Sequence, residues 1–484
     1  MLRKNGKLIV LWLLYSVALI YPSVERYRAL HSHIWDMGMY QNGLWNYSIG
    51  SIDFLVVRHH FRPILGLYAL IYKIMPYGET LLVLQSLSIS IAVFPLYAYA
   101  SEMLGREKAS VVVALYCLFS PVWLINLTNF HPDSLIIPLG LSAMYFQKKG
   151  RTVPFVLSLI LLLTVKEISF FIAALICLSG ALQYKKGISR YALAAVIFVS
   201  GLLVVDFLMP AMEGHALMKI AGVTWMGRDM GALFRTVLTN PWKVAATFIN
   251  YWKAAYFVIL FGSFLFLPLL APLSLLPALP GISLALLSDL WRIQSLAYHY
   301  PATVVPFIFV AFTEAIGKRP SLHKNFFKVL VGVFLLLSSL HLGFFLFYKN
   351  DSYHYSRYLV TPRDDRNRNA LETLIPTDPS IVVSSSNLVN HAVLANRAHY
   401  LTFPSGVTSS DGSAAPADYV VYDKKRAREL VDFVLRRGVY ALREPLDEYE
   451  RSQKALDSSF SSFATIYEYD GFIILKRKGG SAHP

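Results

Sequence analysis

Long runs of apolar residues recur along most of this chain, and they constrain its fold more than any other feature. Several approach the roughly 18–20 residues that an α-helix needs to cross a bilayer. A soluble domain carries about 25% charged residues, whereas this chain of 484 residues is 15% charged and 55% apolar. Because it has too few polar residues to cover itself in water, we predict a mainly α-helical, polytopic membrane protein.

About eleven apolar segments are predicted to be transmembrane helices. Two of them, 134–147 and 153–165, are short for a full span, and one of the two could be re-entrant. Segment 63–76, likewise only fourteen residues long, is predicted to be an amphipathic helix at the membrane interface, although a full crossing there would move every later loop to the other side. The predicted spans are 8–24, 79–101, 109–127, 134–147, 153–165, 168–184, 190–210, 253–271, 273–290, 301–317 and 326–348.

Basic residues indicate how these helices are oriented. The chain has 45 basic and 30 acidic residues, and nearly all of its net charge of +15 lies in residues 1–348. Four basic loops fall on the same side as the basic N-terminus, as the positive-inside rule requires, so we predict a cytoplasmic N-terminus in the cytoplasmic membrane. Nucleic-acid binding is not expected, because the C-terminal region is nearly neutral. The four basic loops are 106–108, 148–151, 185–190 and 318–328.

Residues 349–484 show a different pattern. Strand-like runs such as ADYVVYD (417–423) alternate with polar helical segments such as ARELVDFVLRRG (427–438). We therefore predict two domains, a transmembrane domain at 1–348 and a soluble α/β domain at 349–484. The predicted topology puts the second domain on the external side.

Polar residues that could carry chemistry lie in the segments predicted to be external. Asp36, in HSHIWDMGMYQNGLW, begins a helical pattern among aromatic residues. It could cap that helix, or it could act as a general base or metal ligand at the membrane surface. His60 and Arg62, in VVRHHFRPIL, could contact lipid head groups, or Arg62 could bind a phosphate through its planar guanidinium.

Two further turns interrupt the apolar runs. His131, in NLTNFHPDSL, could belong to no more than a turn with a helix cap. Lys166 and Glu167 divide what would otherwise be a very long apolar run. Charges at such depth usually face a cavity or each other, although a tight exposed turn would also explain them. In the functional interpretation, Lys166 binds a phosphate and Glu167 acts as an acid or base or as a metal ligand.

The last candidates are Arg292, His299 and Tyr300, just before the span at 301–317, where belts of aromatic residues are common. All of these candidates fall on one side of a topology that was chosen for other reasons. We therefore predict that they share a membrane-level cavity on the external side. Motifs for nucleotide binding, zinc binding and serine hydrolysis are absent from the sequence, which disfavours ATP-driven transport and serine hydrolysis.

As a set, several motifs resemble a family of bacterial and archaeal membrane proteins known as domain of unknown function 2079. They are WDMGMYQNGLW, HFRPIL, NFHPDSLIIPL, VKEISFF and the late HY, followed in the family's order by IPTDPSIVVSSS, NRAHYLTFP and ADYVVYD. The resemblance covers nearly the whole chain. Two positions depart from the family pattern, because acids common in the family are replaced here by Gln41 and Ile168. A mechanism that needs a second carboxylate at either position is therefore not supported.

The family is grouped with the GT-C-type integral membrane glycosyltransferases. The resemblance thus implies a GT-C-like fold and the transfer of a sugar from a polyprenyl-phosphate donor to a lipid, glycan or protein on the external face. It implies Asp36 as the catalytic acid of the first external loop, with Glu167 as a second catalytic candidate. A divalent metal, Mg²⁺ or Mn²⁺, could be held by Asp36, His131 or Glu167. The predicted substrate-binding residues are His60, Arg62, His131, Lys166, Arg292, His299 and Tyr300.

Two other classes of protein stay open. A transporter or flippase of a lipid-linked or charged solute would be expected to show paired repeats and broken helices, and neither is evident in the sequence. A non-catalytic scaffold would use the external domain to bind partners in the cell envelope. Under that hypothesis, replacing Asp36 should leave function intact.

Overall fold

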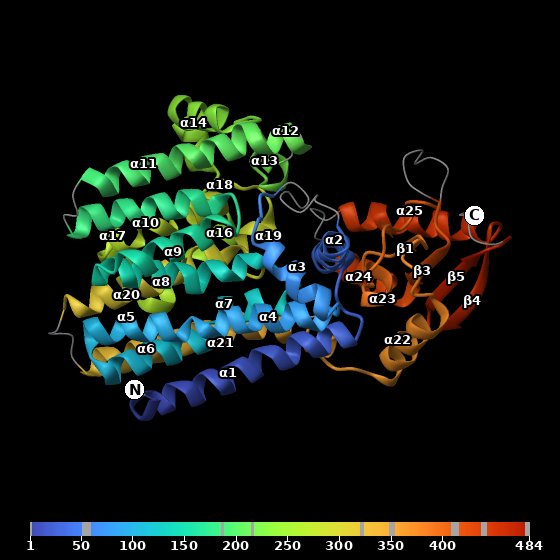
Figure 1. Ribbon diagram of the computed structural model, residues 1–484, viewed down its shortest axis with the longest axis horizontal. Helices are drawn as coiled ribbons and strands as arrows, with labels where there is room; N and C mark the ends of the chain where they lie inside the picture. The colour runs from blue at the N-terminus through green and yellow to red at the C-terminus, as the bar shows by residue number, and fades with distance from the viewer. Residues whose placement is uncertain are drawn as a thin grey trace.

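In the computed structural model, a bundle of helices adjoins a small α/β domain (Figure 1). The structure describes residues 2–50, 60–184, 188–213, 217–319, 324–347, 354–407, 416–436 and 443–479. Helix α1 (Leu2–Arg28) runs along the bundle from the N-terminus toward the α/β domain. We call the two ends of the bundle the N-terminal end and the domain end.

The other helices of the bundle are mostly apolar and vary widely in length. They are α2 (Met39–Ser48), α3 (Leu65–Ile74), α4 (Gly78–Ile91), α5 (Val93–Leu104), α6 (Arg106–Leu118), α7 (Ser120–Leu127), α8 (Ile136–Lys149), α9 (Thr152–Leu163), α10 (Ile168–Tyr184), α11 (Ile188–Leu203), α12 (Met209–Glu213), α13 (Leu217–Ile220), α14 (Met230–Thr239), α15 (Pro241–Ala246), α16 (Tyr251–Leu260), α17 (Pro272–Leu275), α18 (Leu279–Leu287), α19 (Trp291–Gln294), α20 (Val305–Gly317) and α21 (Lys324–Phe347).

Four helical segments of the described residues are long and apolar enough to cross a membrane: Gly6–Arg28, Gly78–Leu104, Ile188–Ala211 and Asn325–Phe347. Helices α6 and α7, bent by 44° at their junction, would make a fifth. Six more apolar helices are shorter, among them α9 in the segment predicted to be short. The chain is thus a multi-pass membrane protein, and the count of eleven spans remains a prediction.

Helix α3 (Leu65–Ile74) forms where a short interfacial helix is predicted, and its ten residues are about 15 Å long, too short to cross a bilayer alone. The continuous helix predicted at 253–271 is wrong. Helix α16 ends at Leu260, and the backbone turns left-handed at Leu265 and Phe266. The segment predicted at 273–290 forms one apolar helical run, Pro272–Leu287, which tightens to a 3-10 turn at Leu276–Ala278.

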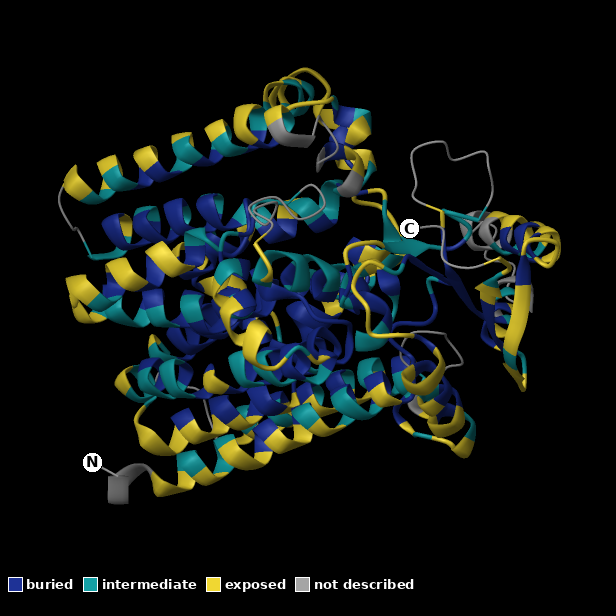
Figure 2. Cartoon of the chain, turned by 45° about the vertical axis from the view of Figure 1, so that its right-hand side comes forward, coloured by how far each residue is buried: buried dark blue, intermediate teal, exposed yellow. Residues whose placement is uncertain are grey.

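The outer surface of the bundle is apolar. Exposed side chains follow α1 on one face, including Leu14, Val17 and Tyr21, and Figure 2 shows exposed residues along the helix that starts at N. Val196 on α11 and Leu340 on α21 are exposed in the same way. Apolar surface of this extent is typical of a face covered by lipid.

Helix ends that border two of the predicted basic loops, 148–151 and 318–328, meet at the N-terminal end of the bundle. Lys148 at the end of α8 pairs with Glu314 of α20, with 2.6 Å between Nζ and Oε1. Lys149 pairs with Glu102 of α5 at 2.7 Å. The ends of α5, α8 and α20 therefore meet there, as expected if these loops face one side of the membrane.

The C-terminal region forms the predicted mixture of strands and helices. Its sheet has the order β2-β1-β3-β5-β4, with β1, β2 and β3 parallel and β4 and β5 antiparallel to their neighbours. The predicted domain boundary at 348/349 lies outside the described residues. The strands are β1 (Val383–Ser385), β2 (Tyr400–Thr402), β3 (Tyr419–Asp423), β4 (Phe463–Tyr469) and β5 (Phe472–Arg477), and the helices are α22 (Pro362–Leu374), α23 (Ala392–Ala395), α24 (Lys424–Arg436) and α25 (Arg443–Ser459).

The α/β domain packs directly on the end of α1. Leu30, just after α1, is buried in the apolar core of the domain with Leu371 and Val389. The Arg426 guanidinium donates a hydrogen bond of 2.7 Å to the Leu30 carbonyl. The domain and the segment that follows α1 therefore lie on the same side of the membrane.

Cysteine labelling tests the predicted orientation. Ser461, in the α/β domain, and Glu107, in a basic loop, are exposed, whereas the native Cys117 and Cys177 are buried. We expect a membrane-impermeant maleimide to label Ser461→Cys in intact spheroplasts and Glu107→Cys only after permeabilisation. The reverse pattern would show that the α/β domain is cytoplasmic.

Candidate active site

Asp36 lies in a sharp turn between α1 and α2, at the domain end of the bundle. Its backbone has φ 77° and ψ −89°, a conformation that residues other than glycine rarely adopt. Residue Gly38, not Asp36, occupies the cap position of α2, so the capping interpretation is wrong. The turn leaves the Asp36 side chain 41% exposed, more than either of the buried carboxylates Asp133 and Glu167.

His131 is the nearest described partner of Asp36, with 3.4 Å between its Nε2 and Asp36 Oδ1. The carbonyl of Asn129 lies 2.9 Å from His131 Nδ1 and can accept a hydrogen bond from it. The His131 ring stacks on His299, with 3.6 Å between the ring centroids. Burial alone would raise the pKa of Asp36, but His131, with His299 and His33 nearby, brings that pKa below its usual value.

Asp133 lies on the other side of the histidine pair and is almost fully buried. Its Oδ1 accepts a hydrogen bond of 2.8 Å from Lys166 and lies 4.0 Å from His299 Nε2. Its Oδ2 lies 3.6 Å from an Arg62 nitrogen. Burial opposes ionisation of Asp133, but these cations, above all Lys166, lower its pKa well below the usual value. Asp133 is thus a buried carboxylate neutralised by cations from separate segments.

Tyr40 supports Arg62 from α2. The Arg62 guanidinium donates a hydrogen bond to the Tyr40 hydroxyl and lies 5.2 Å from the centre of the Tyr40 ring. Arg62 is itself buried. Its side chain is therefore fixed between Tyr40 and Asp133, and it does not extend toward lipid head groups.

Glu167 forms a second buried pair. Its Oε1 lies 2.8 Å from His60 Nδ1, and its Oε2 accepts a hydrogen bond of 3.2 Å from the Phe61 N–H. Burial raises the pKa of Glu167, but His60 outweighs that effect and the net pKa is lowered. Lys166 and Glu167 are each only 5% exposed, so the alternative of an exposed turn is wrong.

Tyr300 and Arg292 complete the cluster. The Lys166 Nζ lies 5.7 Å from the centre of the Tyr300 ring, and the Tyr300 hydroxyl interacts with the Arg292 guanidinium. Burial raises the pKa of Tyr300 to about 12, so its hydroxyl stays protonated and able to donate a hydrogen bond. Arg292 is exposed, and within the described residues no carboxylate forms an ion pair with it.

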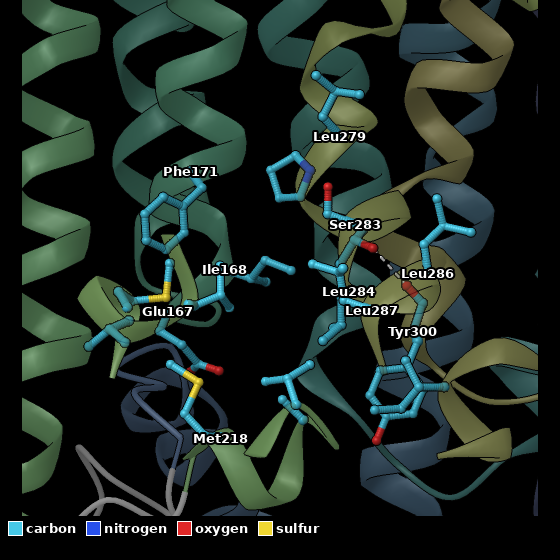
Figure 3. Close-up of a pocket in the computed structure, with 18 of the residues that line it drawn as sticks. Glu167, Ile168, Phe171, Met218, Leu279, Ser283, Leu284, Leu286, Leu287 and Tyr300 are labelled. Atoms are coloured by element: carbon cyan, nitrogen blue, oxygen red, sulfur yellow. Dashed lines mark hydrogen bonds between the residues drawn. The ribbon is translucent and has the colours of Figure 1, made fainter. Parts of the chain in front are cut away.

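A cavity of about 570 Å³ begins at this cluster and extends into the bundle. His60, Asp133, Lys166, Glu167 and Tyr300 line its polar part, and the remaining lining is almost entirely apolar. Figure 3 shows Glu167 and Tyr300 on opposite sides of the open space, with Phe171 and Leu279 farther along it. Asp36 does not line the cavity, but His131 and His299 connect it to the lining residue Asp133. The apolar lining includes Ile168, Phe171, Phe198, Leu233, Phe234, Val237, Leu284 and Leu287.

The structure brings every predicted site residue into one connected cluster, although their individual roles stay predictions. Sequence analysis missed Asp133 and Tyr40 as members of the cluster. Asp133 follows His131 by two residues in the same turn, and Tyr40 lies one helical turn after Asp36. Of the two positions where an acid is common in the family, Ile168 lines the cavity, whereas Gln41 is fully buried outside it.

The predicted metal ligands do not converge. Within the described ranges, no group of three or more His, Cys, Asp or Glu side chains is arranged to hold a metal ion. Asp36 and His131 are adjacent, but both oxygens of Glu167 are already bound to His60 and Phe61. The side chains present therefore do not form a metal site, and we derive no chemical step through one.

Removing the negative charge of Asp133 should destabilise the protein. Asp133→Asn would leave Lys166 and Arg62 buried without a compensating carboxylate, which costs about 3–5 kcal/mol. We expect a clear fall in Tm when unfolding is followed by heating in detergent. The matched control is Asp365→Asn, because Asp365 forms an exposed pair with Arg368 that is worth less than about 1 kcal/mol. Equal shifts for the two variants would contradict the role assigned to Asp133.

Comparison with solved structures finds distant similarity over most of the chain. The crystal structure of ArnT from Cupriavidus metallidurans bound to undecaprenyl phosphate is 14% identical and covers 99% of both chains, with a TM-score of 0.46. The apo form of the same protein is 13% identical over 98% of both chains, with a TM-score of 0.43. An Archaeoglobus fulgidus oligosaccharyltransferase in complex with Zn and sulfate is 14% identical over 86% of this chain and 68% of its own, with a TM-score of 0.41.

Comparison with sequences is more specific about the family. No curated protein matches the chain. The family model described as predicted membrane protein, DUF2079, matches residues 26–462 and so spans both the bundle and most of the α/β domain. The match also includes every residue of the site described above. The chain therefore belongs to the DUF2079 family of predicted membrane proteins.

Proposed function

We propose that this protein is a glycosyltransferase that moves a sugar from a polyprenyl-phosphate donor to an acceptor at the external face of the membrane. One observation carries the proposal. An apolar cavity ends at a cluster of buried charges, and a half-exposed carboxylate, Asp36, lies just beyond that cluster. The motifs resemble the DUF2079 family, and the grouping of that family with GT-C-type glycosyltransferases supports the same reaction class.

The cavity suits a lipid-linked donor. Its apolar lining accommodates a polyprenyl chain without burying unpaired polar groups. The phosphate would lie at the polar end, where Tyr300 offers a hydroxyl donor and Arg292 a guanidinium that no described carboxylate neutralises. Lys166 adds positive charge there, although Asp133 balances part of it. A lipid with one anionic head group fits this arrangement of an apolar interior and a polar end at which Tyr300 and Arg292 can donate hydrogen bonds.

The transfer step needs a base on the acceptor side of the sugar. As the acceptor oxygen attacks the anomeric carbon, Asp36 takes the proton from the acceptor hydroxyl. The bond between the anomeric carbon and the phosphate oxygen breaks, and its electron pair leaves with polyprenyl phosphate. Arg292 and Lys166 stabilise the negative charge that develops on that phosphate. The products are the glycosylated acceptor and polyprenyl phosphate.

A transporter or flippase of a lipid-linked solute is the second candidate. The broken helical segment between Leu260 and Leu287 favours it, since transporters bind their substrates at interrupted helices. The interruptions here at Leu265 and Phe266 lie in an apolar sequence without charged side chains. The charged residues instead gather at the domain end, beside the half-exposed Asp36. We therefore favour the transferase.

Replacing the proposed base tests the function directly. We expect purified protein in nanodiscs to release polyprenyl phosphate from a polyprenyl-phosphate sugar, and Asp36→Asn to lower that rate by about 10²-fold or more, since general bases contribute 10²–10⁴. Donor binding should persist in the variant. The matched control, Asp365→Asn, changes an exposed carboxylate of the α/β domain and should keep the wild-type rate.

Two results would count against the proposal. Turnover by Asp36→Asn at the wild-type rate would show that Asp36 is not the base, although the protein would still be a glycosyltransferase. Donor binding without release by the wild-type protein, across sugars and acceptors, would favour the flippase.

The proposed pairing of Asp36 with His131 predicts a shift in pH dependence. Because His131 contributes most to lowering the pKa of Asp36, His131→Gln should raise that pKa relative to the wild-type protein. Wild-type Asp36 stays ionised down to about pH 4, so the acid limb of the rate profile should move to higher pH in the variant. Rates measured between pH 4.5 and 8 would test this, and an unshifted acid limb would contradict the pairing.

A further inference from the structure

The Asp36 turn is held from outside the membrane domain. The Ile34 N–H donates a hydrogen bond of 3.0 Å to the main-chain carbonyl of Asn387. The next amide, that of Trp35, donates one of 3.0 Å to the side-chain Oδ1 of the same Asn387. Asn387 therefore binds the two residues that immediately precede Asp36, across more than 350 positions of sequence.

The α/β domain also packs against the residues that follow Asp36 in the sequence. A Cβ added at Gly38 would lie 2.7 Å from Asn390 Oδ1 and 2.9 Å from Tyr400 Cε1. Such distances are too short for any side chain, so the close approach of the domain requires glycine here. Asn390 is fully buried and donates a hydrogen bond to Gln41 on α2. The turn is thus enclosed between Asn387 and the pair formed by Asn390 and Tyr400.

The conformation of Asp36 explains why such support is needed. Its φ of 77° and ψ of −89° place it in a region that is costly for a residue with a side chain and persists only where surrounding contacts fix it. Within the turn itself, the Gly38 N–H donates to the His33 carbonyl at 3.1 Å. That local bond does not hold the Ile34 and Trp35 amides. Both are held by their hydrogen bonds to Asn387.

Asn387 is well placed to impose that constraint. It follows β1 (Val383–Ser385), which pairs with both β2 and β3 inside the sheet. The residue between them is tied to the sheet, since the Ser386 N–H donates a hydrogen bond of 2.8 Å to the Val421 carbonyl on β3. A side chain at the end of a paired strand is held more rigidly than one on a free loop.

We infer that Asn387 is a positioning residue for Asp36 and that the α/β domain is a structural part of the active site. Asn387 acts through the Trp35 amide, by holding the turn that points the Asp36 carboxylate toward the acceptor. This inference deepens the proposed function and rests on it for its catalytic consequence. It gives the domain a role beyond the binding of acceptors or envelope partners.

Three substitutions separate positioning from general docking of the domain. Asn387→Ala removes the acceptor for the Trp35 amide, whereas Asn387→Asp keeps an acceptor oxygen in the same place. The matched control is Asn396→Ala, because Asn396 also joins the two domains. It accepts a hydrogen bond of 2.7 Å from the Tyr72 hydroxyl and donates one of 2.7 Å to the Pro76 carbonyl. Neither of those contacts involves the Asp36 turn.

We expect Asn387→Ala to lower kcat about five- to tenfold with little change in donor KM, as the loss of one neutral hydrogen bond would. Asn387→Asp should recover most of the rate at pH 8. At that pH, Asp36 stays ionised even with a second carboxylate nearby. Asn396→Ala should keep the wild-type kcat. Hydrogen–deuterium exchange of the peptide covering 33–38, which needs no turnover, should be faster in Asn387→Ala than in Asn396→Ala.

Equal exchange of that peptide in the two alanine variants would overturn the inference, whatever the enzyme does. An unchanged kcat in Asn387→Ala would overturn the catalytic consequence. If the wild-type protein transfers no sugar, the proposed function fails, while the exchange measurement still decides whether Asn387 holds the turn.

Discussion

Asp133 is a carboxylate buried at the domain end of a membrane bundle, and the arrangement around it follows from the need to neutralise its charge. An isolated charge at that depth would be very costly. Lys166 lies 2.8 Å away on the turn before α10, and Arg62 approaches from the segment before α3. His299 joins them from the turn before α20. Four separate parts of the chain, counting the turn that carries Asp133 itself, thus meet around one buried charge. The cavity lies beside them.

The same constraint explains the chemistry available at the site. Carboxylates that are buried but paired stay ionised, so Asp133 and Glu167 stabilise the fold over the whole neutral range and lose that contribution only in acid. Each is already matched to a cation or histidine in the described residues. Asp36 differs because its side chain is 41% exposed. In the proposed reaction, Asp36 is the carboxylate of the cluster that contacts the acceptor, and the cavity holds the lipid.

Much of this was predictable from sequence for a physical reason. Lys166 and Glu167 interrupt an apolar run, and charges at such depth usually face partners or a cavity, so burial was one of the two alternatives that the sequence left open. The break after Leu260 was not predicted, because hydropathy alone does not register the left-handed backbone at Leu265 and Phe266. The contact between Asn387 and the Asp36 turn could not be predicted, since it joins residues 352 positions apart and nothing in either segment specifies the other.

The central claim is that the cavity receives a polyprenyl phosphate with its head group at the charged cluster. Photocrosslinking tests it most directly, with a polyprenyl phosphate that carries a diazirine on an early isoprene unit and is bound to the protein in nanodiscs. The account predicts adducts on lining residues such as Phe171, Leu233 and Leu284, suppressed by unlabelled polyprenyl phosphate. Adducts confined to lipid-facing residues such as Leu14 on α1 and Leu340 on α21, unaffected by the competitor, would contradict it.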